Sequence, residues 1–192
     1  MRSLFTIHGG EYLVGSKLES HERKPNVWIP SKDIGVDLLV SCKKSKNTST
    51  IQVKFSKDHN IAHGGKDGFL AGGWWQFKPD KILQSTANYW VLVLYSATKT
   101  IQTYYIVIKP AILLRRLQSL RGNEAKTLNT YLQVYKEGNC ITCIETRQMK
   151  KAEKQCLNQI DKRRDFTEFL DGNSIKFSKI GTKLFLKYGR KA

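Results

Sequence analysis

The sequence has few of the features that mark secreted or membrane proteins. Only four of its 192 residues are cysteines, at positions 42, 140, 143 and 156, and a reducing compartment would keep them as thiols. The longest apolar run, Tyr89 to Tyr95, has seven residues, whereas a spanning helix needs about 20. The apolar stretch after Arg2 is too short for a signal peptide. We therefore expect a cytoplasmic, nucleoid-associated protein that is neither secreted nor inserted in a membrane.

Acidic residues are also scarce. Asp and Glu number 16 against 33 Lys and Arg, which gives a formal net charge of +17. Residues 147–192 carry a large share of this excess, with 13 basic and five acidic side chains. Because 40% of the residues are hydrophobic, the composition is that of a globular protein. Such a surface argues against a generic metabolic enzyme and favours a polyanionic partner, nucleic acid above all.

The order of apolar patterns and turn residues predicts an α/β (α+β) protein of one compact domain. The apolar periodicity predicts a helix at 8–21 and strands at 26–30, 36–42 and 49–56, followed by an irregular glycine-rich loop at 57–78. Pro79 can open a short helix, and two strands at 89–95 and 101–108 should form a hairpin. We expect a mainly helical remainder, with helices near 111–121, 124–136 and 147–170 and a last hairpin at 174–178 and 182–187.

Three polar residues stand at compatible positions on two of these strands. Gln52 and Lys54 alternate with the apolar Ile51, Val53 and Phe55, so they share one face of their strand. Asp37 lies on the preceding strand. An antiparallel pairing of Asp37 with either Gln52 or Lys54 centres the turn within residues 42–47, which are polar. The sequence therefore allows Asp37, Gln52 and Lys54 to cluster.

The first helix offers a fourth member of this cluster. Glu11, Val14, Gly15 and Leu18 fall on one helix face, which should dock on the sheet, with Gly15 allowing a close approach. A carboxylate on a docking face requires a cation or a metal ion as partner.

This combination of residues suits metal-assisted phosphodiester hydrolysis. Hard oxygen ligands select Mg²⁺, which polarises the phosphate and acidifies a bound water. Lys54 would stabilise the charge that develops on the phosphate. Gln52 can contribute only its neutral carbonyl oxygen, so Glu11 would supply additional negative charge.

At these positions the chain resembles the PD-(D/E)xK nuclease superfamily, which includes type II restriction enzymes, Mrr-like nucleases and Holliday-junction resolvases. The resemblance covers roughly residues 8–95, and the order α-β-β-β-α-β fits the family core. Two departures stand out: Val36 precedes Asp37 where the motif has proline, and Gln52 replaces Asp or Glu. The resemblance implies a catalytic set of Glu11, Asp37, Gln52 and Lys54. Mg²⁺, with Mn²⁺ as a substitute, would be held by Asp37, Gln52, the backbone carbonyl of Val53 and Glu11.

The resemblance divides the chain into a restriction-endonuclease-like nuclease core at 1–110, a mixed sheet flanked by helices, and a basic, mainly helical extension at 111–192 packed on it. The expected activity is that of a DNA endonuclease on double-stranded or branched DNA, acting as a homodimer that matches the two-fold symmetry of a duplex. A Holliday-junction resolvase or repair nuclease with the same site, and a non-catalytic DNA-binding module, stay open as alternatives. Basic and aromatic side chains are the candidate DNA contacts: Lys43, Lys44, Lys57, Lys66, Trp74, Lys162, Arg163 and Arg164.

Other motifs have more ordinary interpretations. Asp33 is better explained as a turn residue than as a second metal ligand. Cys140 and Cys143 have zinc-finger spacing, but no second pair completes the site. His59 and His63 are more simply loop residues, and the glycine-rich segment 64–68 lacks the pattern of a phosphate-binding loop.

Overall fold

The computed structural model describes residues 9–20, 24–31, 34–41, 48–57, 68–96, 102–149 and 160–170.

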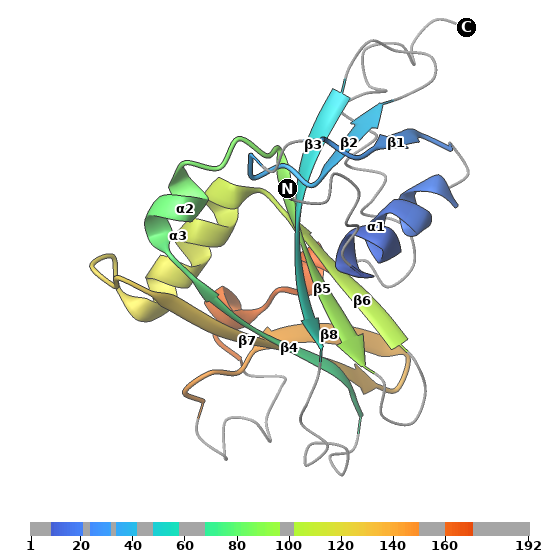
Figure 1. The fold of residues 1–192 in the computed structure, drawn as a ribbon. Helices are drawn as coiled ribbons and strands as arrows, with labels where there is room; N and C mark the ends of the chain where they lie inside the picture. The colour runs from blue at the N-terminus through green and yellow to red at the C-terminus, as the bar shows by residue number, and fades with distance from the viewer. Residues whose placement is uncertain are drawn as a thin grey trace, which may run out of the picture.

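Two sheets form the framework (Figure 1). The large sheet has the strand order β1-β2-β3-β5-β6, and all its neighbours are antiparallel except the parallel pair β3 and β5. The small sheet is antiparallel, in the order β4-β7-β8. The strands of the large sheet are β1 (Asn26–Trp28), β2 (Leu38–Ser41), β3 (Thr48–Lys57), β5 (Tyr89–Ser96) and β6 (Gln102–Ile108).

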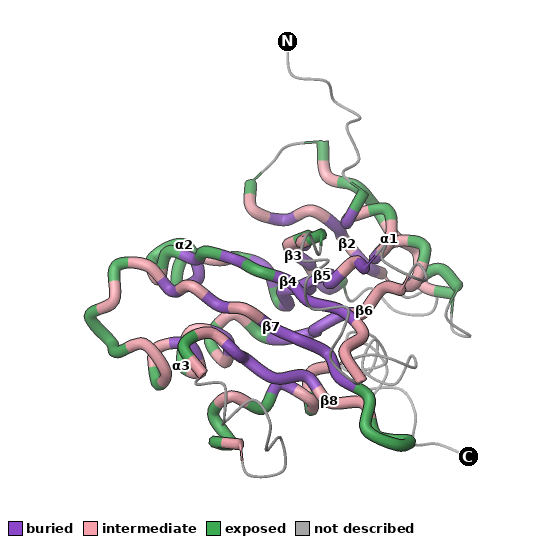
Figure 2. Tube along the Cα trace, turned by 90° about the horizontal axis from the view of Figure 1, so that it is seen from below, coloured by how far each residue is buried: buried purple, intermediate pink, exposed green. Residues whose placement is uncertain are grey.

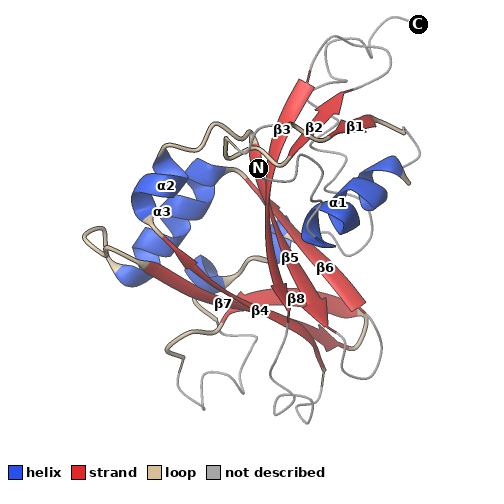
Figure 3. Ribbon diagram, in the orientation of Figure 1, coloured by secondary structure: helices blue, strands red, loops and turns tan. Residues whose placement is uncertain are grey.

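Helices cover both faces of the large sheet (Figure 3). α1 (Gly9–Glu19) lies on one side, whereas α2 (Pro79–Leu83) and α3 (Pro110–Arg121) lie together on the other. Both α2 and α3 begin at a proline, whose fixed φ suits the first helical position. The mixed α/β arrangement predicted from the sequence is confirmed, as are the helix at 8–21, the hairpin strands at 89–95 and 101–108, and the helix near 111–121.

The large sheet separates two apolar cores. Alternate residues of β5 point to opposite faces, so Val91 and Val93 pack against Val14 and Leu18 of α1, whereas Leu92 and Leu94 face α3 and the small sheet. Figure 2 shows that buried backbone runs along β4, β5 and β7 in the middle of the molecule. Because β5 is buried on both faces, its sequence is a continuous apolar run rather than an alternating one.

The expectation of an irregular loop at 57–78 was wrong for its second half. β4 (Phe69–Phe77) is a strand of nine residues that pairs with β7. Its glycines suggest a loop, yet the packing of the strand requires a glycine at position 73. A Cβ on Gly73 would lie 2.3 Å from the ring of Trp75. A strand glycine of this kind marks the place where a large side chain crosses the backbone closely.

The helix expected near 124–136 was also wrong. β7 (Leu128–Glu137) and β8 (Cys140–Glu145) form a hairpin around Gly138. Leu128, Leu132 and Val134 face the core, a spacing that fits a strand as well as a helix. The Thr, Tyr and Val residues between them and the Gly-Asn turn after them favour the strand.

The helix expected at 147–170 does not form in the described part of that range. Residues 160–170 contain two short 3₁₀ turns, η3 (Lys162–Arg164) and η4 (Thr167–Phe169). The extension after residue 110 is therefore not mainly helical where it is described, since it contributes two strands. One of them, β7, pairs with β4, which lies before residue 110, so the small sheet joins both parts of the chain. The hairpin expected at 174–187 lies outside the described residues.

α1 docks on the large sheet through the predicted face, but a different glycine gives the close approach. Val14 and Leu18 are buried, and a Cβ at Gly15 would make only an ordinary 3.8 Å contact with Val27. At Gly10 a Cβ would lie 2.8 Å from the Cβ of Phe55. No helix in the described part of the chain is long and apolar enough to cross a membrane.

Candidate functional site

The candidate site lies on the face of β2 and β3 that is turned away from α1. Leu38 pairs with Ile51 and Leu39 with Thr50, which is the register that the sequence allows for Asp37 and Gln52, although the pairing itself ends at Leu38. Of the two registers that the sequence allows, the structure has this one. Leu38, Ile51 and Val53 face α1. Gln52 and Lys54 therefore share the other face. Asp37 precedes β2, and the strand alternation does not run through it, because Val36 packs into the core on the side of α3 whereas Leu38 faces α1.

Backbone contacts fix Asp37 beside β3. The N–H of Val53 donates to Oδ2 of Asp37 at 2.6 Å, and the N–H of Asp37 donates to the carbonyl of Ile51 at 2.8 Å. The carboxylate is thus held against the backbone between Gln52 and Lys54.

Gly35 brings the chain across Gln52. Its φ is +82°, a left-handed conformation that other residues rarely adopt, and a Cβ there would lie 3.8 Å from Nε2 of Gln52. The segment before β2 therefore turns over the amide of Gln52 instead of extending the strand. This turn limits the space in which that amide can point.

An aromatic ring holds Lys54. Its Nζ lies 5.6 Å from the ring centroid of Trp90, within the range of a cation–π contact. Trp90 is itself fixed, because its Nε1 donates to Oγ of Ser85 at 2.8 Å and its ring packs edge-on against Phe77. The sequence motif does not reveal Trp90, which joins the site only because β3 and β5 pair in parallel, with Gln52 opposite Trp90.

Glu11 occupies a different position from the other three residues. It lies in the first turn of α1, beside Gly10, and α1 packs on the opposite face of the large sheet. Its place in the catalytic set rests on the resemblance to the nuclease superfamily.

The donor atoms at this site suit a hard cation. The carboxylate of Asp37, the amide oxygen of Gln52 and the carbonyl of Val53 are all oxygens on two paired strands. Within the described part of the chain, no group of three or more His, Cys, Asp and Glu could hold a metal ion. An ion that keeps several waters and shares a phosphate, as Mg²⁺ does, fits such a sparse donor set, whereas tetrahedral zinc does not. Cys140 and Cys143, three residues apart on β8, project from opposite faces of that strand.

The candidate DNA contacts have different surroundings. The side chain of Trp74 is 52% exposed. The backbone N–H of Trp74 donates to Oγ of Ser56, which is two residues beyond Lys54 on the same face of β3. Lys57 at the end of β3 and Lys162 are exposed and form no salt bridge within the described residues. Asp33, His59, His63 and the remaining lysines of the set, Lys43, Lys44 and Lys66, lie outside the described residues.

Arg163 and Arg164 already have partners in the fold. Arg163 pairs with Asp161 and donates to the carbonyl of Ser119. Its hydrogen bond lowers the pKa of the Asp161 carboxyl. Arg164 pairs at 2.7 Å with Glu145, which is fully buried and also pairs with Arg121. Arg164 could reach a phosphate only by leaving this pair, so Lys162 is the better candidate of the three.

Comparison with known proteins does not extend these observations. No family model, no curated protein and no solved structure gives a significant match to the chain.

Proposed function

We propose that this protein is a Mg²⁺-dependent DNA endonuclease with a restriction-endonuclease-like core. The observation that carries the proposal is the position of Asp37 against β3, where its carboxylate accepts the N–H of Val53, between Gln52 and Lys54, which share one face of the strand. The element order supports it as well, because α1, β1, β2, β3, α2 and β5 follow the order of the family core, with β4 inserted before α2.

The surroundings of Asp37, Gln52 and Lys54 support a role for each. Asp37, fixed by the N–H of Val53, the amide oxygen of Gln52 and the carbonyl of Val53 would hold the metal. Glu11 belongs to the proposed ligand set on the resemblance alone, because α1 packs on the opposite face of the large sheet. Bound Mg²⁺ would polarise the phosphodiester and lower the pKa of a water ligand. Lys54, held over the ring of Trp90, would place its ammonium beside the phosphate, where negative charge grows during cleavage.

The net charge of +17 supports DNA as the substrate. Lys57 and Lys162 would contact phosphates, and Trp74 offers an exposed ring on β4, whose backbone bonds to Ser56 of β3. Lys43, Lys44 and Lys66 complete the proposed set. A homodimer would supply one site for each strand of the duplex.

The test is cleavage of supercoiled plasmid, linear duplex and a four-way junction, each with Mg²⁺, with Mn²⁺ and with EDTA. We expect metal-dependent cleavage by the native chain and a loss of at least about 100-fold, or about 2.7 kcal/mol, in Asp37→Asn and Lys54→Ala. Asp80→Asn and Lys81→Ala are matched controls, because both residues are exposed on α2, away from the site. If Asp37→Asn and Lys54→Ala cut like the native chain, the site assignment fails.

DNA binding separates the nuclease from a simple binding module. Neutralising about six phosphates would reduce affinity on the order of 10³-fold between 50 and 200 mM salt. Asp37→Asn should bind at least as well as the native chain, because it loses only a repulsive charge. Preferred cleavage of the junction would favour a resolvase, and tight binding without cleavage in either metal would favour the non-catalytic module.

A further inference from the structure

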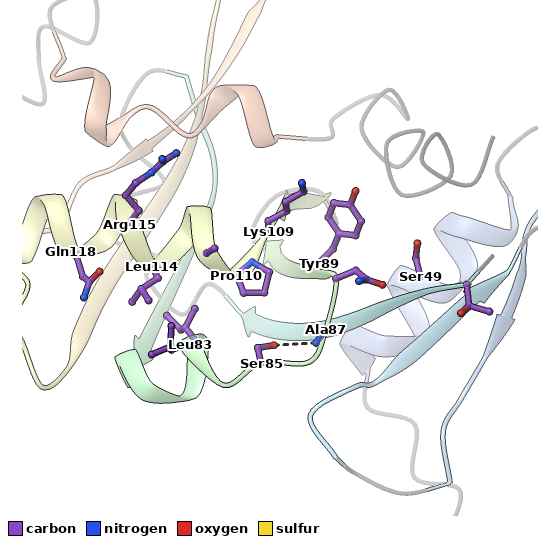
Figure 4. Close-up of a pocket in the computed structure, with 14 residues that line it drawn as sticks. Ser49, Leu83, Ser85, Ala87, Tyr89, Lys109, Pro110, Leu114, Arg115 and Gln118 are labelled. Carbon is purple, nitrogen blue, oxygen red and sulfur yellow. Dashed lines mark hydrogen bonds between the residues drawn. The ribbon is translucent and has the colours of Figure 1, made fainter. Parts of the chain in front are cut away.

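A pocket of about 890 Å³ opens beside the large sheet, where β3 and β5 begin (Figure 4). Thr48, Ser49 and Asn88 line it from the strand side, and residues of α2 and α3 line it from the other. β3 also carries Gln52 and Lys54, but only Thr48 and Ser49, at its beginning, line the pocket, and no residue of the proposed nuclease site does. The pocket is therefore a separate feature of the fold.

The charge of the pocket is positive. Lys109 and Arg115 are its only ionised lining residues at neutral pH among the part of the chain that is described, and no carboxylate lies among them. Lys109 and Arg115 extend toward the same side of α3 in Figure 4. Neither forms a salt bridge within the described residues, whereas the other two arginines of α3, Arg116 and Arg121, pair with Glu168 and Glu145. Two cations at one pocket that have no salt-bridge partner among the described residues favour an anionic ligand.

The opposite part of the pocket is apolar. Ile82, Leu83, Pro110 and Leu114 form this wall, and Leu83 is 75% exposed, unusual for a leucine that packs against a neighbouring element. Small ligand sites combine an apolar wall with a few polar groups that fix orientation. Here the polar groups include Ser49, Asn88 and Gln118, which can donate and accept hydrogen bonds.

We propose that this pocket binds a nucleoside phosphate, with its base on the apolar wall and its phosphate between Lys109 and Arg115. The ligand could be a free nucleotide or the terminal nucleotide of a strand, since both present the same chemistry. This goes beyond the proposed nuclease activity and does not require it. The pocket nevertheless touches the candidate site, because Ser85 lines the pocket and accepts the hydrogen bond from Trp90, which holds Lys54.

The test is calorimetric titration in EDTA, where metal-dependent cleavage cannot contribute. The probes are thymidine monophosphate, adenosine monophosphate, inorganic phosphate and a 5′-phosphorylated tetranucleotide. We expect the nucleoside monophosphates to bind with a Kd of about 1 mM or tighter, and inorganic phosphate more weakly. A tetranucleotide that binds much more tightly than the mononucleotides indicates a strand end as the ligand; equal affinities indicate a free nucleotide.

Variants at exposed positions locate the site. Lys109→Gln and Arg115→Gln should each weaken nucleotide binding about tenfold, as expected for a charged hydrogen bond to phosphate. Leu83→Gln should weaken nucleoside monophosphates and leave inorganic phosphate unchanged. Lys81→Gln is the matched control, because this exposed lysine of α2 does not line the pocket. All four variants should keep the native unfolding midpoint.

Two results would overturn the proposal: no nucleotide binding by the native chain, or normal binding by both Lys109→Gln and Arg115→Gln. A chain that binds nucleotides in EDTA but cleaves no DNA form keeps this proposal and removes the nuclease. A chain that cleaves DNA but binds no nucleotide keeps the nuclease proposal and removes the nucleotide pocket.

Discussion

Two clusters of polar side chains in this fold differ in how deeply they are buried and in what holds them. Glu145 is fully buried, and its two oxygens accept from Arg121 at 2.6 Å and Arg164 at 2.7 Å, with further bonds from the backbone of Tyr131 and Arg147. Asp37 is only half-buried and is held by a backbone N–H, with the lysine of its cluster over an aromatic ring instead. No salt bridge joins Asp37 to Lys54 in the described part of the chain.

This difference separates a structural cluster from a candidate catalytic one. A buried carboxylate with two arginines has no coordination left for a ligand, and it joins α3, β8 and η3. A partly exposed acid and a lysine that do not neutralise each other can still bind a cation and a phosphate. The following predictions test this assignment, beginning with the largest expected effect.

Glu145→Ala should destabilise the fold by about 3–5 kcal/mol, because it leaves two buried or half-buried arginines without a counter-charge. Urea unfolding followed by fluorescence measures the loss. The control is Glu168→Ala, which removes a largely exposed partner of Arg116 and should change stability by at most about 1 kcal/mol. Equal effects of the two substitutions would show that the buried cluster is not the structural one.

Trp90→Leu should lower kcat about tenfold, or about 1.4 kcal/mol, with little change in KM, because Lys54 loses the ring that positions it. Trp90→Phe keeps an aromatic face and should restore most of the rate, although it loses the hydrogen bond to Ser85. Plasmid-cleavage kinetics measure both parameters. A merely structural role for Trp90 would lower stability in both variants and leave the kcat of the folded protein unchanged.

Gln52→Glu should lower the Mg²⁺ concentration needed for half-maximal cleavage by about tenfold, because a second carboxylate is a stronger ligand than an amide. A metal titration of cleavage measures this shift, and Gln76→Glu, at an exposed position of β4, is the matched control. An unchanged metal requirement would argue that Gln52 does not face the metal.

The buried hydroxyl of Tyr135, which is hydrogen-bonded to Gln133, tests how burial of a neutral group makes stability depend on pH. Burial, followed by the nearby Tyr131, raises the pKa of Tyr135 to about 12, and its hydroxyl donates to Oε1 of Gln133 at 2.5 Å. The folded state therefore keeps Tyr135 protonated while the unfolded chain ionises near pH 10. The resulting stability should be complete below pH 10 and disappear as the pH rises through 12. In Tyr135→Phe the unfolding free energy should depend less on pH over this range, and an identical dependence would contradict the assignment.

Prediction from sequence succeeded where local pattern and chain geometry agree. The period-2 alternation around Gln52 and Lys54 and the polar connection before them were sufficient to predict the hairpin and its two possible registers. Prediction failed at β4 and β7, where glycines and an ambiguous apolar spacing concealed strands. These two segments are strands because they pair with each other along the length of β4.

The sequence by itself determined the basic charge, the apolar faces of α1 and β5, and the identity of the acid, amide and lysine on β2 and β3, because these depend on composition and on residues close together in the chain. Only the tertiary structure decided that Trp90 supports Lys54, that Arg164 is tied to Glu145, and that Lys109 and Arg115 share a pocket. The physical reason is that such contacts join distant segments. Which cation is neutralised and which is left for a ligand depends on how the strands and helices pack, and local sequence patterns carry no record of that packing.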